Sequence, residues 1–131
     1  MGKLTISDKK ITEDRLRLNL TKGKLKFSST LFKYRDKDTR QIILYVPSLE
    51  ISGYGIDEKK ALEMLNFSMN DFFNVLTKLP HKQIDIELAK LGWKHVQYKN
   101  KEYSNSYVDG DGKLNNFNAV ADEVEQLTVE A

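Results

Sequence analysis

Residues 41–65 read QIILYVPSLEISGYGIDEKKALEML, and this stretch decides the fold of the chain. It opens with Gln41–Val46, a run rich in β-branched and aromatic residues, which is typical of a well-buried strand. Pro47 ends this strand, because proline has no N–H to donate to a ladder. A shorter strand is expected over Leu49–Tyr54, so two consecutive strands precede the helical part of the stretch.

The rest of the stretch predicts the main helix. Asp57 is a suitable N-cap, and Glu58 places negative charge in the first turn, where the helix dipole favours it. The helix is expected to run from Glu58 to about Leu79 and to bury one face against the sheet, because apolar residues recur at spacings of three and four. These residues are Leu62, Leu65, Met69, Phe72, Leu76 and Leu79.

Further strands are predicted on the N-terminal side of the stretch. Asp14–Leu20 alternates between apolar and polar residues with a period of two, which is typical of a half-buried strand. Thr21–Lys24 supplies a turn, and the alternation resumes at Leu25 in a strand that is expected to reach Tyr34.

Two shorter sets of elements follow the main helix. Pro80 predicts a break and then a short second helix over His81–Leu91, with Gly92 as its C-terminal cap. Short strands are expected around Trp93–Tyr98 and over Tyr103–Val108. The predicted fold class is α+β: an antiparallel sheet of three to four strands, one main helix packed on it and a short second helix.

Residues 1–108 are predicted to form this single domain, and residues 109–131 to form an acidic C-terminal tail. One weak helix is expected in the tail, and its apolar residues would be Leu114, Phe117, Val120, Val124 and Leu127. We expect the tail to contribute to binding, and its removal to leave the fold intact.

Composition narrows the class of protein further. The chain has 131 residues, no cysteine and a formal net charge of +2. Residues 1–40 hold 12 Lys/Arg against 5 Asp/Glu, whereas residues 109–131 hold 1 against 6. This asymmetry is typical of a basic binding face with an acidic tail, and it also fits the solvated strand faces of a lysine-rich protein. Apolar runs are too short to cross a bilayer, so we expect a cytoplasmic protein without membrane contact.

The sequence contains none of the motifs that support common enzyme chemistry. His81 and His95 stand in a chain without cysteine and without a His-x-x-x-His pattern, so they form no zinc motif. A nucleophile elbow, a phosphate-binding loop and a dinucleotide-binding turn do not occur either. We therefore predict a non-enzymatic function, with no catalytic residue, no metal ligand and no cofactor.

The N-terminal strands offer one candidate surface, for single-stranded nucleic acid. Their cations are interleaved with Phe27, Phe32 and Tyr34, and a basic, aromatic sheet face can hold phosphates and stack bases. The candidate cations are Arg15, Arg17, Lys22, Lys24 and Lys26. The aromatic side chains fit the core equally well, so nucleic-acid binding is the alternative interpretation.

A motif within residues 43–72 resembles the core of HicB-like antitoxins. The family typically runs an apolar strand into Pro-Asp-Leu-Pro-Gly, then a strand that ends in Gly-Asp-Thr, then a helix that starts with an acidic residue and Ala. The matching residues are Pro47, Leu49, Gly55, Glu58 and Ala61. The resemblance implies a β-β-β-α-β core, which is a truncated ribonuclease-H-like sheet.

The same resemblance implies a function and a partner. HicB-like antitoxins bind and occlude a small toxin ribonuclease of the HicA type, and this chain lacks the Gly-Ser-His signature of such a toxin. No DNA-binding domain is recognisable in the tail. The leading interpretation is a non-catalytic protein-binding module that uses an exposed sheet edge or the tail, and the oligomeric state stays open.

Overall fold

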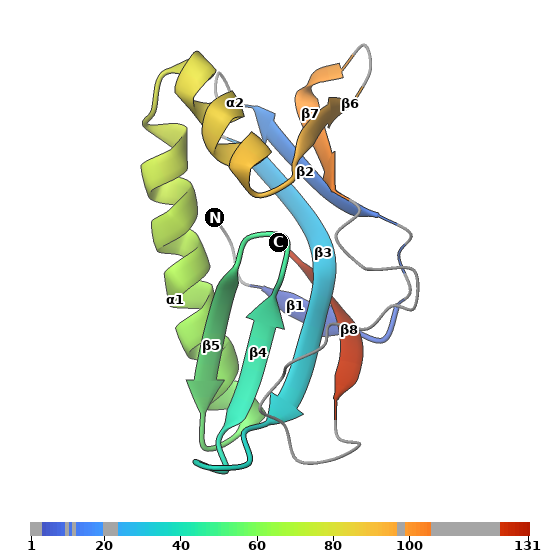
Figure 1. Cartoon of the computed structure of the whole chain (residues 1–131), viewed down its shortest axis with the longest axis vertical. Helices are drawn as coiled ribbons and strands as arrows, with labels where there is room; N and C mark the ends of the chain where they lie inside the picture. Colours follow the sequence, from blue (N-terminus) through green and yellow to red (C-terminus); the bar gives the residue numbers. More distant parts are fainter. Residues whose placement is uncertain (1–3, 10, 12, 20–23, 97–98, 106–123) are drawn as a thin grey trace.

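The computed structural model describes residues 4–9, 11, 13–19, 24–96, 99–105 and 124–131. In chain order the described elements are β1 (Thr5–Ser7), β2 (Asp14–Asn19), β3 (Lys24–Arg35), β4 (Ile42–Val46), β5 (Ile51–Gly55), α1 (Glu58–Thr77), α2 (His81–Lys90), β6 (Lys94–Val96), β7 (Lys99–Asn105) and β8 (Glu125–Glu130). The strands form one antiparallel sheet on which α1 packs (Figure 1). The predicted α+β class is confirmed, although the described residues form a sheet of eight strands instead of three to four.

The long strand β3 organises the sheet, because it pairs with three others. Its first part pairs with β2 from Lys24 to Ser28, and its last part pairs with β4 from Phe32 to Arg35. β8 pairs with Ser28–Lys33 along the opposite edge of β3. β2 and β4 therefore share one edge of β3 and part from each other between these two ladders.

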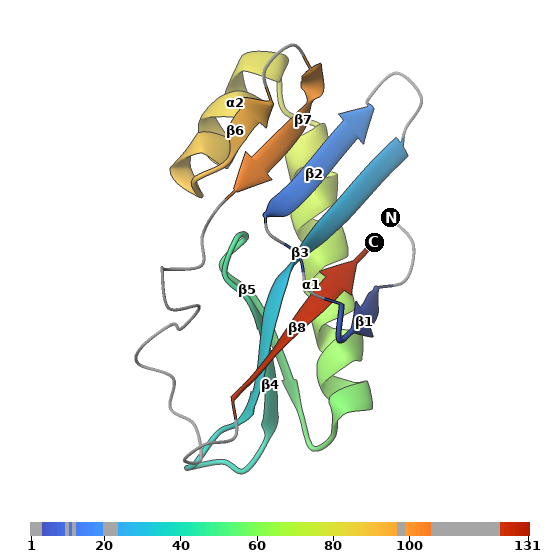
Figure 2. The same ribbon diagram turned by 90° about the vertical axis from the view of Figure 1, so that its right-hand side faces the viewer.

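The sheet curls around the main helix. Figures 1 and 2 show from two directions that β5, β4, β3, β8 and β1 curve about α1. α2, β2, β6 and β7 gather at the other end of the molecule. We call the sheet face that packs against α1 the inner face and the opposite one the outer face. The curl brings β5 and β1, which are two edges of the sheet, to the two sides of α1.

Close contact between α1 and β5 depends on two glycines. A Cβ atom at Gly53 would lie 2.4 Å from the carbonyl oxygen of Ala61 and 2.5 Å from the main-chain nitrogen of Leu65. At Gly55 it would lie 2.7 Å from the main-chain nitrogen of Ala61. These distances are far below van der Waals contact, so the helix backbone rests directly on the strand only because both side chains are absent.

The apolar stripe of α1 faces the core, as predicted. Leu65, Met69 and Leu76 are buried, and the other stripe residues are partly buried against the same core. Phe73 is more deeply buried than Phe72, and it meets Phe27 of β3 edge to face with ring centroids 5.8 Å apart. The side chain of Asp57 caps the helix by accepting from the Lys60 N–H at 2.8 Å.

The second helix ends at the predicted glycine. Gly92 has a φ of 94°, and its N–H donates to Ala89 O while the Trp93 N–H donates to Leu88 O, both at 3.0 Å. This pair of bonds is a Schellman motif, which satisfies the last carbonyls of the helix. It directs the buried Trp93 ring toward Phe27 in the core. Neither α1 nor α2 is long and apolar enough to span a membrane.

The end of the chain differs from the prediction. Val124 and Leu127 were expected in a helix, but Glu125–Glu130 is strand β8, which lies between β1 and β3. The helical spacing of apolar residues was misleading here, because Leu127 and Val129 also alternate with period two and face the inner side of the sheet. Leu114, Phe117 and Val120 lie outside the described residues.

Replacement of Gly53 by Ala should destabilise the domain, because the added methyl group meets helix backbone that has little freedom to move. We expect a loss of at least about 1–3 kcal/mol, the usual cost of overpacking. The free energy of unfolding in urea measures the loss. Ser52→Ala, at an exposed position of the same strand, is the control and should change little. Equal stability of the two variants would show that α1 does not rest on β5 as described.

Two valines at the end of the chain test the placement of β8. Val129 is 0% exposed in the sheet, whereas Val124 is 42% exposed just before it. Val129→Ala should cost roughly 1.5–3 kcal/mol of folding free energy, because it removes fully buried apolar surface. Val124→Ala should have little effect on the melting temperature. Because β8 lies between β1 and β3, removal of residues 124–131 should unfold the domain, in contrast to the sequence-based expectation that the tail can be removed; a folded truncated chain would contradict the central place of β8.

Candidate functional site

The HicB-like motif residues Pro47 and Leu49 lie in the turn between β4 and β5. Both side chains are buried, and the turn closes when the Leu49 N–H donates to Val46 O at 3.3 Å and the Glu50 N–H donates to Pro47 O at 3.2 Å. Glu50 holds a φ of 54° in this turn. Pro47 and Leu49 therefore fix the return of the chain into β5.

The other three motif residues lie where β5 passes into α1. Gly55 and Ala61 allow strand and helix to touch, and Ala61 is fully buried. Glu58, in the first turn of α1, pairs with Lys33 of β3 with an Nζ–Oε1 distance of 3.5 Å. All five motif residues thus have roles in the fold, and all but Glu58 are buried, so the motif by itself defines no binding surface.

The candidate nucleic-acid residues are only partly brought together. Arg15, Arg17 and Lys26 are exposed on the outer face, and Arg17 lies directly opposite Lys26 in the β2–β3 ladder. Lys24 lies in β3, but its side chain and all of Lys22 fall outside the described part of the chain.

Acidic residues lie among these cations. Arg15 Nη2 is 2.6 Å from Glu13 Oε1, and the register places Glu130 opposite Ser28. The local charge is therefore mixed instead of strongly positive, which weakens the attraction for phosphate.

The three aromatic residues of the first strands divide between the two faces. Phe27 belongs to the core on the inner face. Phe32 and Tyr34 alternate with core residues and lie on the outer face, opposite Tyr45 and Ile43 of β4. Phe32 is buried and Tyr34 is partly buried, so neither presents a fully open ring for base stacking.

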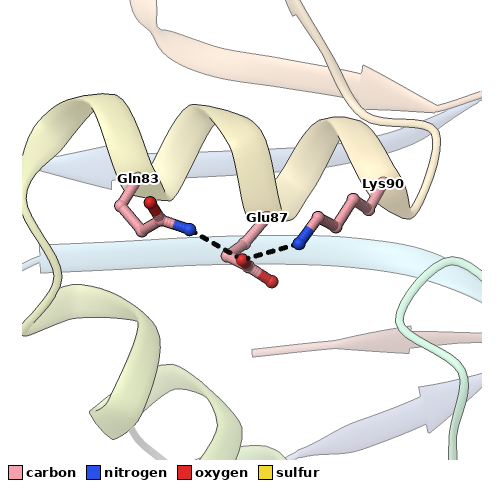
Figure 3. A network of polar contacts seen from close by, with 3 residues as sticks. All are labelled: Gln83, Glu87 and Lys90. Atoms are coloured by element: carbon pink, nitrogen blue, oxygen red, sulfur yellow. Dashed lines mark hydrogen bonds and ion pairs between the residues drawn. The ribbon is translucent and has the colours of Figure 1, made fainter.

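The carboxylate of Glu87 on α2 is held by neighbours on its own helix (Figure 3). Gln83 Nε2 donates to Glu87 Oε1 at 2.8 Å, and Lys90 Nζ lies 3.1 Å from the same oxygen. The bonds from Lys90 and Gln83 hold the pKa of Glu87 below its usual value. These contacts at spacings of four and three support the helix, as such pairs commonly do.

A buried polar cluster fills the point where β2 and β4 part. Asp14 is 2% exposed, and its Oδ1 accepts from the Thr30 N–H of β3 at 2.7 Å. The hydroxyl oxygens of Ser29 and Ser48 lie 2.6 Å apart, and the Trp93 indole N–H donates to Ser48 O at 2.8 Å. Asp14 thus satisfies an N–H of β3 that neither β2 nor β4 reaches.

Burial raises the pKa of Asp14 above its usual range, while hydrogen bonds from Thr30 and Ser29 act in the opposite direction and nearby Glu13 adds to the rise. Its second oxygen, Oδ2, has no hydrogen-bond partner among the described atoms. A proton on Oδ2 would remove the cost of a buried charge, and it would leave Oδ1 free to accept from Thr30.

A cleft of about 610 Å³ opens between β1 and the first turns of α1. It is lined by Leu4, Thr5, Ile6, Ser7, Asp8, Lys33, Glu58, Lys59, Leu62, Glu125 and Leu127. The apolar members come from both walls, and the charged members carry both signs. Its volume lies in the range of typical ligand sites.

Sequence reasoning missed both the cluster and the cleft. Asp14 shares the phase of Leu16 and Leu18 in its alternating strand, so the period did indicate that its carboxylate points inward. The cleft left no such signal, because β1 is only three residues long and its partner β8 is distant in sequence.

No protein-family model matches the chain, and neither a curated protein nor a solved structure is significantly similar to it. In the described part of the chain, no group of three or more His, Cys, Asp or Glu side chains is placed to hold a metal ion.

Asp14→Asn should change how stability depends on pH. The raised pKa means that the folded state holds the proton more tightly, so Asp14 stabilises the fold most below its ordinary pKa, and this contribution is lost as pH rises through the folded pKa. Asparagine stays neutral and keeps the oxygen that accepts from Thr30, so this decline should disappear. The expected difference is about 1.4 kcal/mol for each unit of the pKa shift.

Urea unfolding of both chains between pH 3 and pH 8 provides the measurement. Asp71→Asn, at an exposed position on α1, is the matched control and should keep the decline of the parent chain. The assignment is wrong if the Asp14→Asn variant and the parent chain follow the same curve.

Proposed function

We propose that the chain is a non-catalytic protein-binding module of the HicB-like antitoxin type, which neutralises a small toxin ribonuclease by binding it. The observation that carries this proposal is the pair of sheet edges beside α1. β1 pairs only with β8 and β5 only with β4 among the described strands. Unpaired edges present rows of N–H and C=O groups that another chain can complete.

Exposed apolar side chains border one of these edges. Tyr54 in β5 is 49% exposed, and Ile56 just after the strand is 75% exposed. An aromatic ring and an aliphatic side chain beside an open edge supply the apolar contact that strand pairing alone lacks. The motif residues support the HicB-like resemblance, because each has a structural role. Pro47 and Leu49 form the turn between β4 and β5, and Gly55 and Ala61 allow β5 to contact α1.

Single-stranded nucleic-acid binding is the second candidate. It is favoured by Arg15, Arg17 and Lys26, which are exposed together on the outer face. The interspersed carboxylates of Glu13 and Glu130 make this the weaker proposal, because phosphate binding depends on a net positive field.

Purification of the tagged chain from its native host separates the two candidates. We expect a small basic protein to co-purify in a fixed ratio, to cleave RNA when isolated and to lose that activity when the purified chain is added back. A partner without ribonuclease activity would contradict the toxin assignment.

Retention of RNA without protein would instead support the second candidate. RNA affinity should then fall steeply with salt, because counterions are released on binding. Lys26→Ala should weaken that binding, whereas Lys78→Ala, an exposed lysine at the C-cap of α1 on the inner side of the sheet, should not.

A further inference from the structure

The second edge of β1 faces the cleft. β8 exchanges main-chain hydrogen bonds with β3 at Ala131 and Phe27, at 2.9 and 3.2 Å. Successive residues of an antiparallel strand direct their main-chain N–H and C=O groups to opposite edges. Glu130 and Thr128 therefore direct theirs toward β1, where the register places Thr5 and Ser7 opposite them. The N–H and C=O of Ile6 consequently point away from β8, toward the edge of β1 that pairs with no described strand.

The cleft is built around this edge. All five residues of Leu4–Asp8 line it in succession, and Leu62 and Lys59 of α1 form the facing wall. The segment after β1 is anchored, because the Thr128 hydroxyl donates to the carbonyl of Lys9. This edge of β1 therefore borders a partly open cleft that has α1 as its other wall.

We propose that this cleft binds an extended segment of a partner protein, which adds a strand to β1 and thereby lies between the sheet and α1. The inference rests on the proposed protein-binding function and names its surface. Main-chain hydrogen bonds to Ile6 would hold the segment, and alternate side chains would contact Leu62 on the facing wall.

The two walls determine the kind of occupant. A strand added to β1 would lie about 4.8 Å from it, the usual spacing of paired strands, with α1 as its neighbouring layer. Lys59 and Leu62 of α1 already cover the inner side of this edge, so a folded layer beside the added strand would meet the helix. The occupant is thus a segment without a folded layer beside it.

The charges of the cleft indicate the side chains of that segment. Lys33 and Glu58 pair with each other, at 3.5 Å. No ion pair joins Asp8, Glu125 or Lys59 to another residue of the described chain, which leaves an acidic excess at the rim. The fitting segment alternates apolar residues with basic ones.

A fluorescein-labelled peptide, Val-Lys-Val-Lys-Val-Lys-Val, tests the proposal by fluorescence polarisation on the full chain. Two further peptides carry N-methyl groups, one on every valine and the other on every lysine. In an extended strand these two sets of N–H groups lie on opposite edges, so only one set faces β1. We expect one methylated peptide to bind at least about fivefold more weakly than the parent peptide and the other to bind like it.

Charge variants locate the site. Asp8→Lys and Glu125→Lys should each weaken binding of the parent peptide roughly tenfold, since each turns an attraction at the rim into a repulsion. Asp71→Lys changes the net charge equally on the exposed face of α1 and should leave the affinity unchanged. Unaltered melting temperatures confirm that the variants are folded.

Absence of peptide binding, equal effects of the two methylations, or equal effects of Asp8→Lys and Asp71→Lys would each overturn the cleft proposal. Its failure can be told apart from that of the proposed function. A native partner that binds the Asp8→Lys variant as tightly as the parent chain removes the cleft but leaves the protein-binding function. A chain that captures no protein from its host removes that function, whatever the peptides show.

Discussion

The structure depends on one close contact, that of the α1 backbone with β5 at Gly53. With no side chain between them, the Ala61 carbonyl and the Leu65 nitrogen come within reach of the strand itself. This contact holds the helix close to β5 at one edge of the curled sheet. The side chains of Leu65, Met69 and Leu76 fill the space between the helix and the inner face of the sheet. A helix that lies this close to β5 leaves space on its other side, which is where the cleft beside β1 opens.

The second constraint is the division of one edge of β3 between β2 and β4. Two strands that leave a common partner in different directions expose main-chain groups between them, and such groups are costly when buried. Asp14 supplies an acceptor for the Thr30 N–H, and the Ser48 carbonyl accepts from Trp93. The cluster thus replaces a missing length of ladder, and it links the β4–β5 turn to the segment that follows α2.

Much of this architecture could be predicted from periodicity and turn chemistry. The strands β2 to β5, the Asp57 cap, the buried stripe of α1 and the Gly92 cap are local features, and local spacing carries them. β8 could not be predicted, because Leu127 and Val129 fit either period and the partner that decides between them, β3, lies about a hundred residues earlier. The cleft could not be predicted from the sequence for the same reason, because β1, β8 and α1 meet only in the folded chain.

The separation of fold residues from candidate binding residues bears on how the HicB-like motif is interpreted. Pro47, Leu49, Gly55 and Ala61 are buried or covered, so a partner would not touch their side chains. Such a motif can be kept by any protein that needs this strand-turn-strand-helix contact, whatever it binds. Partner choice would then lie in the surfaces that the motif does not specify, namely the edge of β1, the rim charges of Asp8 and Glu125, and the exposed end of β5. A chain could therefore retain the motif and change its partner by altering a few rim residues, with little effect on its stability.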